Sequence, residues 1–233
     1  MGASGGGVSI KIETAKYDLK EIINDLIGTD FIQTENYEDT RNPDNYFIVK
    51  TKDVITIYNS QFVETFFKRQ DTKEIQSFID YFEKPELIFA HERYDSGGTY
   101  SYSLIYNGEL KRQFRSLSYE TKIDFGDLEE IEKEWKNGEI KKFDLGGGDF
   151  EIIIKNSVTG IECDEGNIPQ VILDQLQFDK LGFDDDSSKI IEKAFYIKNP
   201  RIENVVSKKT VGTLIESNLN TTINETRPWW KFW

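Results

Sequence analysis

The dipeptide Asn107-Gly108 is the feature that most constrains the fold of this chain. It separates two runs of strand-forming residues, TYSYSLIY at 99–106 and ELKRQFRS at 109–116. Asn-Gly is a strong signal for a two-residue hairpin turn, because both residues tolerate the positive φ that the turn requires. A third run, LIFAHER at 87–93, precedes them and ends at the turn sequence DSGG. The pattern predicts three consecutive antiparallel strands.

Neither face of this hairpin is cleanly apolar. A two-residue turn pairs Tyr102 with Gln113, so the tyrosine face meets long polar side chains. We expect the aliphatic stems of Lys111 and Arg115 to cover the tyrosine rings. The core-facing residues are then Ile105, Leu110 and Phe114. The alternative is a bulge that shifts the register of the two strands.

Tyr100, Tyr102 and Tyr106 form a row on one face of the first hairpin strand. If that face is partly open to water, the row is a candidate contact surface, because tyrosine offers both apolar area and a hydroxyl group. If a neighbouring helix covers the face, the same rings belong to the core.

Helical spacing of apolar residues predicts helices at 18–27, 72–82 and 127–137, and alternation predicts strands at 8–13 and 150–155. A further short helix is predicted at 189–196. The glycine runs at 2–7 and 146–148 precede strands, whereas phosphate-binding loops follow a strand and open a helix. We therefore interpret both runs as flexible linkers.

These elements predict an α+β fold. A mixed or antiparallel sheet packed by helices occupies 8–143, and a smaller α+β unit occupies 149–226. The smaller unit either forms its own core or shares the first one. Residues 227–233 form a tryptophan-rich tail.

The composition narrows the class of partner. The 233 residues include 42 acidic and 29 basic side chains, and the formal net charge is −13. A negative field repels nucleic acids and anionic membranes, so we expect neither as a partner and favour a basic protein instead. With one cysteine, no signal peptide and no long apolar run, the sequence predicts a cytoplasmic protein.

Few residues offer catalytic or metal chemistry. His91 is the only histidine, and alternation places it on the apolar side of its strand, where a hydrogen-bonded structural role is expected. An enzyme would have to combine His91 with Glu92 and Asp95 in one site. One histidine and one cysteine exclude the usual four-ligand zinc site. We predict no catalytic residues, no metal and no cofactor.

The C-terminal tail is unusually aromatic. Its candidate contact residues are Trp229, Trp230, Phe232 and Trp233. Tryptophan is frequent at binding hot spots and gains much from burial. The tail is therefore expected either to pack on its own domain or to anchor a partner or a second copy.

The stretch GTYSYSLIYNGELKRQFRS, followed by FGDLEEIEKEW, resembles uncharacterised bacterial α+β proteins, some of which are similar to toxin-immunity or defence-associated partners. The resemblance covers about residues 87–137 and brings no catalytic residues. It implies a non-enzymatic, intracellular, immunity-type protein that meets a basic partner through complementary charge. The alternatives are a carboxylate-dependent enzyme of unknown substrate and a structural homo-oligomer joined by the C-terminal tail.

Overall fold

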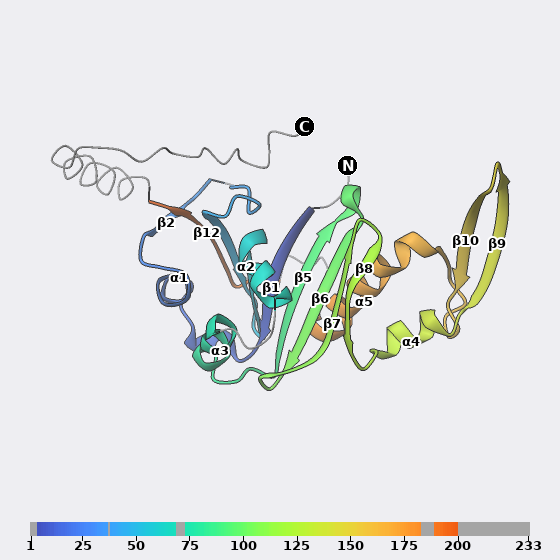
Figure 1. Ribbon diagram of the computed structural model, residues 1–233. Helices are drawn as coiled ribbons and strands as arrows, with labels where there is room; N and C mark the ends of the chain where they lie inside the picture. Colours follow the sequence, from blue (N-terminus) through green and yellow to red (C-terminus); the bar gives the residue numbers. More distant parts are fainter. Residues whose placement is uncertain (1–3, 37, 69–72, 183–188, 200–233) are drawn as a thin grey trace, which may run out of the picture. The chain divides into compact units, whose positions relative to one another are not determined.

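The computed structural model describes residues 4–36, 38–68, 73–182 and 189–199. The chain divides into two compact units, Met1–Lys198 and Asn199–Trp233, and all helices and strands discussed below belong to the first. This unit has an α+β fold, built on a nine-stranded antiparallel sheet and a separate three-stranded sheet (Figure 1). Among the described residues, no helix combines the length and hydropathy needed to cross a lipid bilayer.

The large sheet contains strands from both ends of the unit. Its members are β1 (Ser4–Lys11), β2 (Phe31–Thr34), β3 (Asn45–Lys50), β4 (Val54–Tyr58), β5 (Leu87–Tyr94), β6 (Thr99–Tyr106), β7 (Glu109–Leu117), β8 (Glu120–Gly126) and β12 (Glu192–Lys198). They lie in the order β2-β12-β3-β4-β1-β5-β6-β7-β8, with every neighbouring pair antiparallel. The smaller sheet contains β9 (Glu139–Gly146), β10 (Asp149–Lys155) and β11 (Glu162–Asp164), in the order β11-β10-β9.

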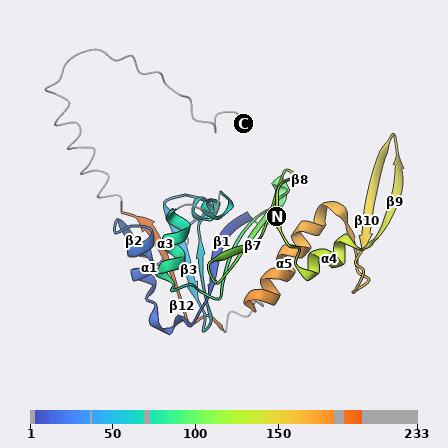
Figure 2. The same ribbon diagram turned by 60° about the horizontal axis from the view of Figure 1, so that its bottom comes forward.

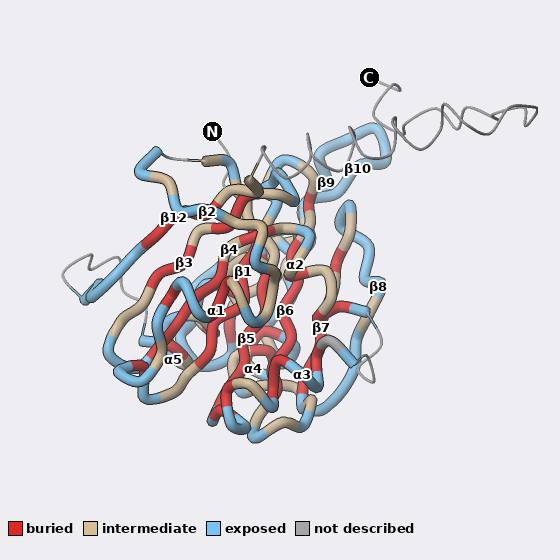
Figure 3. The backbone as a smooth tube through the Cα atoms, turned by 90° about the vertical axis from the view of Figure 1, so that its left-hand side faces the viewer, coloured by how far each residue is buried: buried red, intermediate tan, exposed pale blue. Residues whose placement is uncertain are grey.

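Helices cover both faces of the central strands. The α-helices are α1 (Leu19–Leu26), α2 (Ser60–Glu64), α3 (Lys73–Tyr81), α4 (Glu130–Lys136) and α5 (Ile168–Leu181), and the 3-10 turns are η1 (Thr14–Lys16), η2 (Thr65–Phe67), η3 (Asp95–Gly97) and η4 (Glu165–Asn167). The core on one face joins α1, α2 and α3 to the sheet through residues such as Ile22 and Phe78. The core on the other face joins α5 to β5 and β6 through Leu176, Phe89 and Leu104 (Figure 2). Burial follows the central strands, whereas β9 and much of β8 are exposed (Figure 3).

The predicted helix at 18–27 is confirmed. The side chain of Asp18 accepts hydrogen bonds from the backbone N–H groups of Lys20 and Glu21, at 2.9 and 3.0 Å. Such an N-cap supplies acceptors for the first unpaired donors of a helix. Ile22 and Ile23 then face the core.

The predicted register of the central hairpin is wrong, and the alternative with a bulge is correct. The register shifts between Leu104 and Ile105, so Tyr102 lies opposite Phe114 rather than Gln113. The two rings stack with centroids 5.5 Å apart on the face covered by α5. Phe114 therefore does not share the face of Ile105, which packs with Leu110 on the opposite side. Because helices cover both faces, both can be apolar.

Gly5, Gly6 and Gly7 belong to β1 and are not part of the predicted flexible linker, while Gly2 lies outside the described residues. A Cβ atom on Gly6 would lie only 2.8 Å from Val63 Cγ1, and one on Gly7 would lie 3.0 Å from the Tyr58 ring. Glycine here allows α2 and neighbouring side chains to approach the strand closely.

Two further predictions for the second half are corrected. Gly146 ends β9, and Gly147 and Gly148 form the turn of the β9–β10 hairpin, so the predicted boundary between 8–143 and 149–226 falls within one hairpin. A helix is predicted at 189–196, but residues 192–196 belong to the strand β12. Its Ala194 and Tyr196 face the core, and Phe195 stacks on Phe47 with centroids 4.1 Å apart. This pairing within the sheet overrides the weak local helical signal.

Candidate functional site

A cavity of about 300 Å³ lies where β6, β7 and β8 meet α4, β10 and the start of α5. Its apolar walls come from Phe114, Leu128, Trp135, Ile154, Ile168, Pro169 and Ile172. Its polar and charged lining consists of Tyr102, Arg112, Asp124, Glu132, Lys136 and Glu165. Binding sites commonly combine apolar walls with a few converging polar groups in this way.

Arg112 is the most deeply buried charge of the cavity. Strand β7 directs it toward α4, and only 1% of the residue is exposed. Its Nε donates to both carboxylate oxygens of Glu132, at 3.1 and 2.9 Å, and one terminal nitrogen donates to Glu132 Oε1 at 2.5 Å. The other terminal nitrogen donates to Asp124 Oδ1 at 2.5 Å and to the carbonyl oxygen of Phe125 at 2.9 Å. Burial lowers the pKa of Arg112, but its hydrogen bonds to Glu132 and Asp124 outweigh this effect and raise the pKa overall.

Glu132 connects this arginine to the start of α4. One of its carboxylate oxygens accepts the backbone N–H of Glu129 at 2.8 Å, so the same group that binds Arg112 also caps the helix. Tyr102 lies beside it, and burial together with the negative charge of Glu132 raises the pKa of the phenol. The phenol thus stays protonated and acts as a hydrogen-bond donor.

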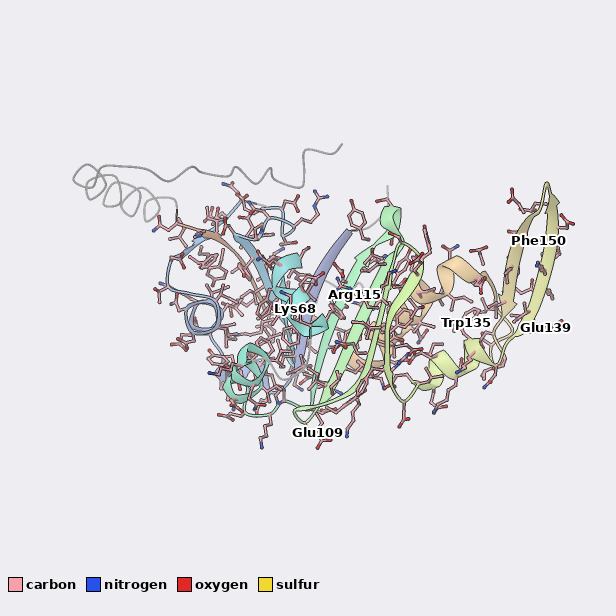
Figure 4. All side chains as sticks on the ribbon, viewed as in Figure 1. Lys68, Glu109, Arg115, Trp135, Glu139 and Phe150 are labelled. Carbon is pink, nitrogen blue, oxygen red and sulfur yellow. The ribbon has the colours of Figure 1, made fainter. Side chains whose placement is uncertain are left out.

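Trp135 lines the cavity and carries an unused hydrogen-bond donor in its buried ring. Only 4% of the residue is exposed, and its buried Nε1–H has no acceptor within reach in the described part of the chain. Figure 4 labels this side chain on α4. An unsatisfied buried donor costs about 1–3 kcal/mol.

The mouth of the cavity is acidic. The side chain of Asp124 is 58% exposed, and Glu165 is also exposed. Glu132 already neutralises Arg112 inside the cavity, which leaves Lys136 as the one cation of the lining without a carboxylate bonded to it. The surrounding segment 120–136 carries seven acidic and three basic residues. The field at the mouth therefore favours cations.

The functional groups of the lining are mainly carboxylates. Its side chains include carboxylates, a protonated phenol and an indole, and the residues named above contain no serine, threonine, cysteine or histidine. In the described ranges, no group of three or more histidine, cysteine, aspartate or glutamate residues is arranged to hold a metal ion.

The structure places the predicted tyrosine row beneath α5. Tyr100 and Tyr102 are buried and Tyr106 is half-buried, because α5 packs against β6. Only Tyr102 lines the cavity. Of the two interpretations of this row, the structure supports the face covered by a helix and not the open contact surface. The predicted contact residues Trp229, Trp230, Phe232 and Trp233 lie outside the described residues.

The structure does not bring His91, Glu92 and Asp95 into one site. His91 and Glu92 are consecutive strand residues and point to opposite faces of the sheet. His91 lies against the rings of Phe89 and Tyr58. On the other face, Glu92 accepts from Arg115 at 3.3 Å. Asp95 lies beyond the strand in η3 and binds Arg93 at 2.6 Å.

Sequence reasoning missed Arg112, Asp124, Glu132 and Trp135. Two signals pointed to them. Arg112 is two residues from Phe114 and so shares its inward face, and Glu132 is three residues from Trp135 and so shares its helix face. A charged residue on an inward face requires a partner, which makes it a candidate for a buried ion pair.

Comparison with protein-family models, with curated proteins and with solved structures finds no match for this chain. The resemblance to immunity-type proteins therefore stays a prediction. The functional conclusion rests on the geometry of the cavity and on the charge around it.

Proposed function

We propose that this chain is a non-enzymatic binding protein whose cavity at Asp124 and Glu165 receives a cationic side chain of a basic protein partner. The observation that carries the proposal is the charge of the site. Arg112 is bonded to Glu132 and to Oδ1 of Asp124, while the carboxylates of Asp124 and Glu165 are exposed at the mouth. A cytoplasmic, immunity-type role is part of the proposal, and the single cysteine and the net charge of −13 support it.

The cavity fits a lysine or arginine of an extended segment. The aliphatic stem of such a side chain can lie along apolar walls such as Leu128 and Ile172, while its charged end reaches Asp124. Charge and apolar contact then act together, and the surrounding acidic surface steers the partner toward the cavity.

A calorimetric titration with an oligolysine peptide tests the proposal. We expect Asp124→Asn combined with Glu165→Gln to weaken binding on the order of tenfold, which corresponds to about 1.4 kcal/mol. Asparagine keeps an acceptor for Arg112, so the buried network survives the change.

The matched control removes the same number of charges elsewhere. Glu21→Gln on α1 combined with Asp53→Asn after β3 changes two exposed carboxylates that do not line this cavity. We expect this control to bind like the wild type, and an oligoglutamate peptide not to bind. Equal losses in both double variants would show that net charge alone is recognised, which would contradict the proposed site.

A further inference from the structure

Strand β9 has an unpaired edge. In the order β11-β10-β9 it has β10 as its neighbour on one side, and no described strand lies on the other. Toward the tip the hairpin is only two strands wide, because β11 pairs with β10 only at Ile153–Lys155. The free N–H and C=O groups of such an edge form a template for another strand.

The same hairpin exposes apolar side chains. Ile140 is 68% exposed, Leu145 is 65% exposed and Phe143 is 49% exposed. Phe150 on β10 is exposed as well, as Figure 4 shows near the labelled end of the hairpin. A two-stranded hairpin is marginally stable in water unless further strands or a helix pack on it. An additional strand paired with β9 would stabilise this hairpin.

The charges of β9 are complementary to β9 itself. Lys142 and Asp144 are two residues apart, so they share one face, and Phe143 between them points to the other face. When two antiparallel copies are related by a two-fold axis at Phe143, Lys142 of each copy lies opposite Asp144 of the other. Phe143 then lies opposite its own copy. Opposite charges and aromatic pairs across strands both stabilise a sheet.

From this complementarity we infer that β9 pairs with β9 of a second copy of this chain, which makes the protein a symmetric dimer. The two three-stranded sheets join into one continuous sheet across the two-fold axis. Because one edge pairing buries little area, the dimer dissociates at low concentration. This interface is separate from the cavity of the proposed function.

The other long free edge, β8, is less suited to this pairing. Its Asp124 is bound by Arg112, and its Lys122 is bound by Glu120. On β9, in contrast, the corresponding charges make contacts only within the hairpin. Lys142 Nζ lies 3.7 Å from the centre of the Phe150 ring, and Asp144 accepts the N–H of Gly146 at 2.8 Å. Both charges can therefore meet a second copy without breaking a buried network.

Sedimentation velocity of the full chain, from micromolar to submillimolar concentration, tests the inference. We expect a concentration-dependent dimer. Lys142→Glu and Asp144→Lys should each weaken it on the order of tenfold, because each change turns two attractive pairs into repulsive ones. Combining both substitutions swaps the charges and should restore the dimer. Failure of the double variant to restore it would overturn the inference, as would a monomeric wild type at every concentration.

Two controls locate the interface. Lys122→Glu makes the same charge reversal on β8 and should leave the dimer unchanged; if it alone dissociates the dimer, the pairing through β9 is wrong. A chain ending at Thr226 should still dimerise, and its loss of dimerisation would assign the contact to the tail instead. Far-ultraviolet circular dichroism of every variant checks that the fold is retained.

Discussion

At the scale of single residues, the pair Arg112–Glu132 determines how the cavity is built. Removing one member of a buried ion pair leaves an uncompensated charge, which costs about 3–5 kcal/mol. We expect Glu132→Leu to lower the free energy of unfolding by about 3 kcal/mol, because Arg112 then keeps only the exposed Asp124 as a carboxylate partner. Urea denaturation measures this loss.

The double variant Arg112→Met with Glu132→Leu provides the control. An apolar pair of similar volume needs no charge compensation, so we expect it to regain most of the loss. The two substitutions are therefore strongly non-additive in a double-mutant cycle. Additive effects would show that the two side chains do not depend on each other.

His91 makes the stability of the protein depend on pH. Burial between Phe89 and Tyr58 lowers the pKa of this histidine to about 4, compared with about 6.5 in an unfolded chain. The contribution of neutral His91 to the free energy of unfolding is fully present above about pH 6.5, and it is lost as the pH falls toward 4. The total loss is at most about 3 kcal/mol.

The measurement compares wild type with His91→Gln by urea denaturation at several pH values. We expect the free energy of unfolding of the wild type to fall more steeply than that of the variant between about pH 6.5 and 4. Parallel curves for the two proteins would mean that His91 protonates equally easily in the folded and unfolded states.

At the scale of the elements, close packing of α2 on β1 depends on one glycine. Gly6→Ala introduces a methyl group 2.8 Å from Val63 Cγ1, so we expect a loss of about 1–3 kcal/mol from overpacking. Gly5→Ala is the matched control, since a Cβ atom there meets nothing within 4 Å. Thermal denaturation of both variants should show a lower midpoint for Gly6→Ala alone. Equal midpoints would mean that α2 moves to accommodate the methyl group.

Elements with strong local signals could be predicted from the sequence. The cap at Asp18 and the turn at Asn107-Gly108 each fix their own element through nearby backbone groups. The sequence left the bulge after Leu104 as an alternative to the regular register, and it did not predict the strand β12. Both depend on what packs against them: α5 in the first case, and β2 and β3 in the second.

The cavity could not be predicted from the sequence for a similar reason. Arg112 and Glu132 lie 20 residues apart and meet only because α4 folds back on β7. Local patterns show that each charge occupies an apolar face, but they do not show which charges become partners. The predicted tyrosine row belongs to the core because α5 packs on it. The sequence did not indicate this contact, because α5 lies more than 60 residues further along the chain.

At the scale of the whole molecule, the net charge of −13 attracts a cationic partner of the kind proposed above. At physiological ionic strength, screening limits the range of the interaction between exposed charges to about 8 Å. We therefore expect the association rate with a cationic partner to fall steeply as salt is added, with a smaller change in the dissociation rate. Stopped-flow kinetics at several salt concentrations measure both rates. A salt-independent association rate would contradict electrostatic steering.

The most direct test of the cavity uses Trp135 itself. Three of the four tryptophans are Trp229, Trp230 and Trp233, so replacing these three with phenylalanine leaves Trp135 as the only one in the full chain. We would titrate this variant with oligolysine and record its tryptophan fluorescence. We predict a saturable change that reverses with salt and is lost with Asp124→Asn and Glu165→Gln, but not with Glu21→Gln and Asp53→Asn. An unchanged Trp135 signal during demonstrated binding would contradict the assignment of this cavity as the contact site.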